Sequence, residues 1–429
     1  MSLVVALDIG TSGVRAAAVD EAGVLVARAR VAGTDSRAAD GTVDPEGWWM
    51  RAEAALRALG DLLRTKGRDM SEVVALTADG TSGSLTLTDD DATPVAPGLM
   101  YDSVHPEHPG LPSAAARAMA LLPRAPGAAH VAHQTDLVLW RLGARAGATD
   151  VNNALKTGHD PQTGWPMALR EGPLGPLLPE AHPLFAPLGT ASGRARALGL
   201  PGNCTVHAGT TDSIAAFLAA GVGAPGDAVT SLGSTLVVKL VSPVRIDDVA
   251  RGIYSHRLGD LWLAGGASNA GGAGLAAALP GANLAALSDR IDPEKPTGLD
   301  LYPLPSVGER FPVADPFMPP RLSPRPRDDA IFLQAMLEAL ARIEGRGYAA
   351  LEELGAPALR RVLTAGGGAS NPAWTAIRRR VLGVPVNAAE QTDAAIGLAQ
   401  ALVRHVCGDD DGPGGGAGGA VLRLDKGPD

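Results

Sequence analysis

The sequence predicts an α/β protein made of two duplicated domains, and three observations support this fold class. The chain has 429 residues, which exceeds one ordinary core and favours two or three domains. Short β-prone runs separated by Gly-rich turns are interspersed with helical stretches. Two segments more than 200 residues apart, which begin at Ala6 and Thr230, share a pattern of strand, tight Gly/Thr/Ser turn and returning strand. We interpret this repeat as two related domains, each of which offers a hairpin tip to a shared cleft.

The N-terminal part is predicted to start with an antiparallel meander of three apolar runs, 3–7, 14–19 and 23–31. A helix opens at Asp44-Pro45-Glu46, where Asp suits an N-cap and Pro suits the first turn. A further strand covers 73–77. Residues 94–201 are richer in Pro, Ala and Gly, and we expect helices and long loops there, inserted on the first domain.

Beyond Pro201 the strands resume. The predicted elements are a helix from Ser213 to Ala220, hairpins over 228–232/236–241 and 254–258/261–264, a long amphipathic helix over 329–354, a strand over 361–364, and helices over 372–382 and 394–406. We therefore expect an N-terminal domain at 1–223 and a C-terminal domain at 224–407. The Gly- and Asp-rich segment 408–429 is expected to be a flexible tail.

Composition excludes several classes of function. A net charge of −9 argues against broad binding of nucleic acid or anionic membrane, although local backbone dipoles can still hold a phosphorylated ligand. No stretch approaches the ~20 apolar residues of a membrane helix, and the N-terminus lacks signal-peptide features. Cys204 and Cys407 are expected to be reduced, buried thiols of a cytoplasmic protein.

The two hairpin tips are candidate phosphate sites. Backbone N–H groups and hydroxyls in a Gly/Thr/Ser turn can face a phosphate, and Gly permits close approach. Asp8, at the end of the first strand, is a candidate for holding Mg²⁺ directly or through water. Either hairpin alone is also compatible with an ordinary β-turn. The pair, with Asp8 beside the first hairpin, favours phosphate binding.

Asp212 lies at the start of a predicted helix and allows two interpretations. It could be a structural N-cap, or it could be a general base that takes the proton of an attacking hydroxyl, since a carboxylate near a helix N-terminus stays ionised. Further along, Gly366-Gly367-Gly368 separates a strand from a helix and suits close approach of an adenine or ribose. Trp374 would lie either in the core or against the base.

These segments in this order resemble the FGGY carbohydrate kinase family. The matching motifs are Asp8-Ile-Gly-Thr-Ser, Gly209-Thr-Thr-Asp, Ser231-Leu-Gly-Ser-Thr and Gly366-Gly-Gly-Ala-Ser-Asn. The resemblance implies two duplicated domains of the actin, Hsp70 and hexokinase type (ribonuclease H-like), with ATP in a central cleft. It also implies phosphoryl transfer from ATP, with Mg²⁺, to a small sugar.

Other segments resemble the D-ribulokinase branch of cyanobacteria and plants, whose plant members were first labelled xylulokinase-like. These segments are Asp79-Gly-Thr-Ser, His133-Gln-Thr-Asp-Leu-Val-Leu-Trp, Asn152-Asn-Ala-Leu-Lys, Tyr254-Ser-His-Arg, Gly265-Gly-Ala-Ser-Asn-Ala-Gly-Gly and Glu309-Arg-Phe-Pro. The implied reaction converts ATP and D-ribulose to ADP and D-ribulose 5-phosphate.

The resemblance also assigns roles to individual residues. Asp212 would be the base, and Asp8 would position Mg²⁺ or the sugar. The sugar site would comprise Asp8, Thr11, Ser12, Ser82 and Asp212. The ATP site would comprise Thr11, Ser12, Gly233, Ser234, Thr235, Gly367, Gly368, Asn371 and Trp374.

One loop departs from the family pattern. At Tyr101-Asp102-Ser103 many relatives carry an Asp near an Arg that touches the sugar, but here no Arg follows closely and His105 is the nearest basic residue. The alternatives to a D-ribulose kinase are a xylulokinase or another polyol or ketose kinase, and, in a different class, a non-catalytic actin-like nucleotide-binding protein. We expect a monomer or homodimer whose partner is a small sugar rather than a nucleic acid or a membrane.

Overall fold

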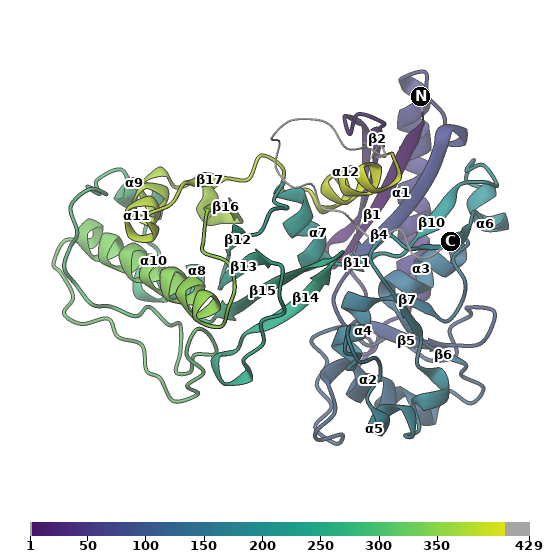
Figure 1. The fold of residues 1–429 in the computed structure, drawn as a ribbon, viewed down its shortest axis with the longest axis horizontal. Helices are drawn as coiled ribbons and strands as arrows, with labels where there is room; N and C mark the ends of the chain where they lie inside the picture. The colour runs from purple at the N-terminus through teal and green to yellow at the C-terminus, as the bar shows by residue number, and fades with distance from the viewer. Residues whose placement is uncertain (1, 408–429) are drawn as a thin grey trace. The chain divides into compact units, whose positions relative to one another are not determined.

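The computed structural model describes residues 2–407, which form two compact units (Figure 1). Unit 1 extends to Ala219 and resumes at Asp393, whereas unit 2 runs from Ala220 to Thr392. The predicted tail at 408–429 lies outside the described residues. Both units have mixed α/β architecture, and the predicted two-domain fold class is confirmed.

The unit 1 sheet has the strand order β3-β2-β1-β4-β10-β9, with β11 paired to β4. Its strands are β1 (Leu3–Gly10), β2 (Gly13–Asp20), β3 (Leu25–Ala32), β4 (Val73–Gly80), β9 (Pro187–Thr190), β10 (Thr205–His207) and β11 (Thr210–Thr211). Strands β1, β4, β10 and β11 run in parallel, and the central strands β1 and β4 are apolar and almost completely buried because helices cover both faces.

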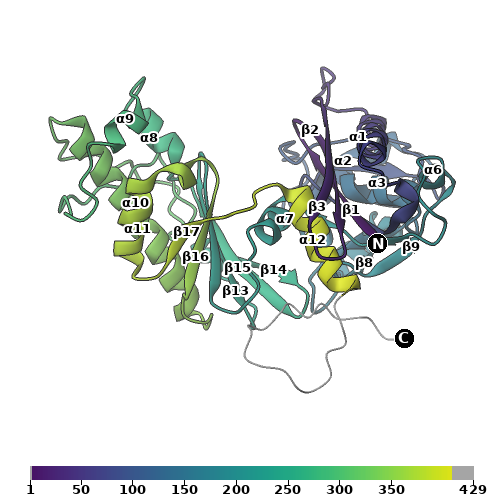
Figure 2. The same cartoon turned by 90° about the horizontal axis from the view of Figure 1, so that it is seen from above.

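Alternating alanines of β2 separate the two faces of this sheet. Ala16 and Ala18 pack with helices α1 (Glu46–Thr65) and α3 (Gln134–Leu142), whereas Ala17 packs with α12 (Ala394–Val406). Helix α7 (Asp212–Ala219) lies beside α12, and Figure 2 shows α1 and α12 on opposite sides of the strands. From the sequence we predicted that the helix at 394–406 belongs to the second domain. The structure instead places α12 on the unit 1 sheet, because its apolar stripe fits either sheet and a tertiary contact decides between them.

The inserted region of unit 1 contains helices and loops, as expected for 94–201, and also two short strand pairs that were not predicted. Strand β5 (Leu85–Thr88) pairs with β6 (His130–His133), and β7 (Ala148–Asp150) pairs with β8 (Glu180–His182). The helices of this region are α2 (Ser113–Leu121), α4 (Val151–Thr157), α5 (Met167–Arg170) and α6 (Gly193–Arg196). Leu85, Leu87 and Val131 pack with α2 in a separate apolar cluster.

The unit 2 sheet has the order β14-β15-β13-β12-β16-β17. Its strands are β12 (Asp227–Leu232), β13 (Leu236–Ser242), β14 (Tyr254–Leu258), β15 (Leu261–Ser268), β16 (Arg361–Ala365) and β17 (Val386–Ala388). Its helices are α8 (Gly272–Ala278), α9 (Leu284–Ser288), α10 (Asp329–Glu353) and α11 (Pro372–Leu382). Short 3₁₀ turns occur in the chain at Met70–Glu72, Leu122–Arg124, Gly175–Leu177, Val249–Arg251 and Gly367–Ser370.

The two sheets repeat one topology. The series β3-β2-β1-β4-β10 in unit 1 corresponds to β15-β13-β12-β16-β17 in unit 2, with two antiparallel pairings followed by two parallel ones in each case. The two hairpins that the sequence singled out, β1–β2 and β12–β13, occupy equivalent places in the two units.

Candidate active site

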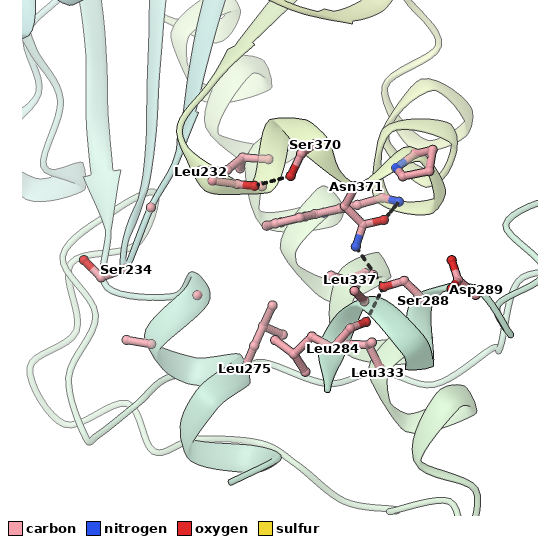
Figure 3. Close-up of a pocket in the computed structure, with 18 residues that line it drawn as sticks. Leu232, Ser234, Leu275, Leu284, Ser288, Asp289, Leu333, Leu337, Ser370 and Asn371 are labelled. Atoms are coloured by element: carbon pink, nitrogen blue, oxygen red, sulfur yellow. Dashed lines mark hydrogen bonds between the residues drawn. The ribbon is translucent and has the colours of Figure 1, made fainter. Parts of the chain in front are cut away.

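A cavity of about 590 Å³ lies within unit 2 (Figure 3). Its lining comes from the β12–β13 hairpin, α8, α9, α10 and the Gly-rich turn before α11. The lining residues include Leu232, Gly233, Ser234, Leu275, Leu284, Ser288, Asp289, Leu333, Leu337, Gly367, Gly368, Ser370, Asn371 and Trp374. Mostly apolar walls with a few polar groups are typical of sites for small molecules and cofactors.

Asn371 fixes one wall of this cavity. It caps α11, since its Oδ1 accepts a hydrogen bond from the Trp374 N–H at 3.0 Å. Its Nδ2 donates to the Ser288 hydroxyl of α9 at 2.9 Å, and that hydroxyl donates to the Leu284 carbonyl at 2.8 Å (Figure 3). These bonds join α9 and α11 across the cavity, so the spacing of the two walls is set by side chains of the protein.

The glycine turn after β16 permits a close approach of two backbones. Gly366 has φ +83°, and a Cβ there would lie 2.6 Å from the Leu232 carbonyl oxygen. A Cβ on Gly368 would lie 2.5 Å from the Trp374 ring. Trp374 itself is 4% exposed and lines the cavity, so it belongs both to the core and to the wall.

A buried ion pair holds the elements that carry this wall. The Arg378 guanidinium of α11 donates to both Glu344 oxygens of α10, at 2.7 and 2.6 Å, and to the Thr364 hydroxyl of β16 at 2.6 Å. Arg378 and Glu344 are inaccessible to solvent. Loss of one partner would leave the other charge buried without compensation, so the pair links α10, α11 and β16 strongly.

In unit 1 the candidate residues gather where parallel strands end. Strand β1 ends at Gly10, β4 at Gly80 and β11 at Thr211, and Thr211 is in register with Gly80. Asp212 follows directly and opens α7, where its carboxylate accepts the Ser213 N–H at 2.7 Å. The carboxyl end of a parallel sheet is a common location for ligand sites.

Two more aspartates lie behind this edge. Asp8 of β1 is paired in register with Asp79 of β4, and the Arg15 guanidinium donates to Asp8 Oδ2 at 2.5 Å. Burial raises the pKa of Asp8 although Arg15 opposes this effect. Burial raises the pKa of Asp79 well above its usual range, and the charges of Asp8 and Asp212 add to the rise. The motif Asp79-Gly-Thr-Ser did not predict this burial, because an Asp that follows an apolar strand is common in exposed turns.

The remaining candidate site residues of unit 1 are Ser82 and the tip of the first hairpin. Thr11 and Ser12 form the exposed turn between β1 and β2, as predicted. The Ser82 hydroxyl oxygen is buried and has no hydrogen-bond partner among the described residues, which fits a group that awaits a polar ligand. The preceding turn is held by Gln134, whose Oε1 accepts from the Thr81 N–H at 2.9 Å and from the Thr81 hydroxyl at 2.8 Å.

In the 101–103 loop, the basic residue nearest in sequence, His105, is not the one that binds the loop backbone. His105 contacts Ser103 and Glu107, and Asp102 pairs with Arg37. The guanidinium that holds the loop is Arg117 of α2, which donates to the carbonyls of Ser103, at 3.0 Å, and Tyr101. It also donates to the Gly83 carbonyl at 2.9 Å. Arg117 was not predicted as the partner of this loop, because it is distant in sequence and α2 contacts the loop only in the folded chain.

The predicted residues thus fall into two sets. Six of the predicted ATP residues line the unit 2 cavity: Gly233, Ser234, Gly367, Gly368, Asn371 and Trp374. Thr235 is absent from that lining, although its carbonyl accepts the Gly233 N–H at 3.1 Å within the hairpin. Asp8, Thr11, Ser12, Ser82 and Asp212 belong to unit 1.

Two features that residues 2–407 lack bear on other ligands. No group of three or more His, Cys, Asp or Glu side chains is arranged to hold a metal ion by itself. No helix in this part of the chain is both long and apolar enough to cross a bilayer. Both cysteines are free; Cys204 is buried as expected, whereas the expectation of burial is wrong for Cys407, which is exposed at the end of α12.

Comparison with known proteins defines the class. Residues 228–403 match the model of the FGGY family of carbohydrate kinases, C-terminal domain. A xylulose kinase from Rhodospirillum rubrum is 26% identical, with a TM-score of 0.77 over 95% of this chain and 90% of that one. A xyloylose kinase from Brucella ovis is 22% identical, with a TM-score of 0.82 over 95% and 91%. A Plasmodium falciparum glycerol kinase solved with ADP is 14% identical, with a TM-score of 0.76 over 94% and 89%.

The fold and the matched domain define a phosphotransferase that acts on carbohydrates. The similarity to the FGGY family model is carried by residues 228–403, which span unit 2 from Ala228 and most of α12.

Proposed function

We propose that the protein transfers the γ-phosphate of ATP to a hydroxyl of a pentulose, with D-ribulose as its preferred substrate and Asp212 as the general base. The observation that carries the ATP part is the convergence of six predicted nucleotide residues on one unit 2 cavity. In this proposal the N-terminal domain binds the sugar and presents the first phosphate hairpin, while the C-terminal domain binds the adenosine and presents the second.

Asp212 suits the role of base for two reasons. It begins α7 at the sheet edge, where its half-buried carboxylate can meet a substrate hydroxyl. The positive end of α7 also favours its ionised form. In the reaction Asp212 takes the hydroxyl proton, the sugar oxygen bonds to the γ-phosphorus, and the bond from phosphorus to the β–γ bridging oxygen breaks to release ADP.

Mg²⁺ fits this set of residues as a companion of the nucleotide. Magnesium keeps several waters and needs only one or two carboxylates beside substrate phosphates, so the absence of a three-ligand cluster in residues 2–407 is compatible with it. Asp8 is the candidate carboxylate, since Arg15 takes Oδ2 and leaves Oδ1 for a metal-bound water. When bound, the ion neutralises phosphate charge.

The choice of D-ribulose rests on motif resemblance, chiefly Asp79-Gly-Thr-Ser with its Ser82 hydroxyl in need of a partner. A second candidate substrate is D-xylulose, because a xylulose kinase is 26% identical over nearly the whole chain. The two pentuloses differ in the configuration of one hydroxyl, so a few polar contacts decide between them. We place the enzyme in the cytoplasm, where free thiols such as Cys204 persist.

The test is a coupled ADP-release assay with D-ribulose, D-xylulose, ribitol, xylitol and glycerol, run beside a sugar-free control. We expect D-ribulose to give the highest kcat/KM and to stimulate ADP release above the control. Preference for D-xylulose would select the second candidate. ADP release that no sugar stimulates would contradict the proposal.

A further inference from the structure

Lys156 of α4 is a half-buried cation without a role in the mechanism above. Its Cβ is 3.8 Å from the position that a Cβ on Gly83 would occupy, so the side chain starts beside the turn that carries Ser82. Burial lowers the pKa of its amine, and the negative charge of Asp212 opposes this effect. The side chain therefore starts at the Ser82 turn and its charge interacts with the proposed base.

Helix α4 is anchored to the strand that leads to Asp212. Its Asn152 donates to the Thr210 hydroxyl of β11 at 3.2 Å, two residues before Asp212. At its N-terminus the Asp150 carboxylate accepts the N–H groups of Asn152 and Asn153 at 2.9 and 3.0 Å. Asn152 and Asn153 are completely or almost completely buried. These bonds fix the backbone at Lys156 relative to Asp212 before any ligand binds.

A second contact joins the same helix to the β4–α3 side of the site. The Asn153 amide donates to the Thr135 hydroxyl at 3.0 Å, and the neighbouring Gln134 holds Thr81 of the Ser82 turn. Three sides of one location are thus held by buried hydrogen bonds: the Ser82 turn, the start of α7 and helix α4. Such support is what a positioned ligand-binding side chain requires.

The Lys156 ammonium has three N–H donors, so it can keep its contacts within the protein and also donate to a ligand oxygen. Lys156 remains partly accessible, so a ligand can still reach it. A polyhydroxylated, uncharged sugar supplies oxygen acceptors of the required kind. We propose that the Lys156 ammonium binds an oxygen of the sugar substrate between Ser82 and Asp212, next to the hydroxyl that is phosphorylated. This inference rests on the proposed function and assigns a further substrate-binding residue to it.

The first test compares Lys156→Met with Lys239→Met, a matched loss of charge at a half-buried lysine on β13 of unit 2. Loss of a charged hydrogen bond to substrate should raise the KM for sugar about 10- to 100-fold. The KM for ATP should change less than about twofold, because the adenosine site lies in unit 2 and does not involve Lys156. Lys239→Met should leave the KM for sugar unaltered.

A second measurement uses the wild-type protein and so does not depend on the folding of a variant. Acetic anhydride labelling with peptide mass spectrometry gives the acylation rate of each lysine. D-ribulose should slow acylation of Lys156 several-fold, ATP alone should not, and Lys66 and Lys295 should react at constant rates as internal controls.

The outcomes separate the two proposals. If the wild-type enzyme phosphorylates a sugar while Lys156→Met retains the wild-type KM for that sugar, or if sugar fails to protect Lys156, this inference is overturned and the proposed function stands. If no sugar stimulates ADP release by the wild-type enzyme, the proposed function fails and the inference fails with it. A lower Tm with both KM values unaltered would assign Lys156 a purely structural role and would also overturn the inference.

Discussion

Asp8 and Asp79 lie opposite each other on the parallel strands β1 and β4, but only Asp8 is neutralised by a cation. Asp8 pairs with Arg15, whereas neither carboxyl oxygen of Asp79 has a partner among the described residues. Asp79 is 0% exposed and is therefore shielded from bulk solvent. A buried carboxyl in this position keeps its proton more readily than an exposed one, because burial and the charges of Asp8 and Asp212 raise the pKa of Asp79.

This relationship predicts the effect of Asp79→Asn. Because asparagine has nearly the same shape and no charge, the variant should retain a Tm within about 3 °C of wild type at pH 7. Differential scanning calorimetry checks this. A fall of roughly 8 °C or more would mean that an ionised Asp79 makes a necessary interaction in the folded protein.

Asp212→Asn should lower kcat about 100- to 10,000-fold, because the amide accepts no proton from the sugar hydroxyl. Affinity for ADP, measured by calorimetry, should remain within about twofold. Asp61→Asn, at an exposed site on α1, provides the matched charge control and should retain wild-type turnover. Wild-type kcat in the Asp212 variant would remove Asp212 from the role of base.

The glycine turn offers a pair of substitutions that differ in their surroundings. A Cβ on Gly368 would come within 2.5 Å of Trp374 and 2.7 Å of Leu232, whereas one on Gly367 would meet nothing within 4 Å. Gly368→Ala should therefore displace the cavity wall and raise the KM for ATP roughly tenfold or more. Gly367→Ala should raise it less. The KM for sugar, measured in the same assays, should respond to neither; equal effects of the two alanines on ATP would contradict the wall geometry.

Stability should depend on pH through Asp150. Burial, with the nearby Asp136 charge, raises the pKa of Asp150 from 3.8 to about 6. Between these values the folded protein binds more protons than the unfolded chain, so this contribution to the free energy of unfolding decreases as pH rises and is constant above about pH 6. The total change is on the order of 3 kcal/mol.

Asp150→Asn removes this titration while it retains a side chain that can cap α4. The Tm of the variant relative to wild type should therefore increase between about pH 4.5 and 6.5 and then level off. Thermal melts in a buffer series test this. A difference in Tm that does not vary across the series would show that Asp150 titrates as it does in the unfolded chain.

Local patterns predicted much of the fold. The hairpins around Thr11-Ser12 and Gly233-Ser234-Thr235, the long helix α10 and the start of a helix at Asp212 all occur where period, turn residues and capping indicated. Each of these features depends on residues close in sequence. The duplicated strand order then follows from the repetition of one local hairpin in two units.

Features that depend on distant contacts were not predictable in the same way. Arg117 reaches Tyr101 and Gly83 only because α2 packs against β5, and the apolar stripe of α12 does not specify the sheet on which it packs. Asp79 looked like a turn residue because the predicted strand stopped at Thr77, whereas β4 continues to Gly80. Its lack of a partner emerges only once the neighbouring strands are known.

The position of α12 has a consequence for synthesis on the ribosome. Its Ala395 and Ile396 cover Ala17 of β2, although they are translated after all of unit 2. The nascent first unit therefore carries an uncovered apolar sheet face while about 170 further residues emerge, an interval of roughly 10 to 35 seconds at typical rates of synthesis. Chaperone binding to the growing chain should be strongest during that interval and should cease when the last helix docks.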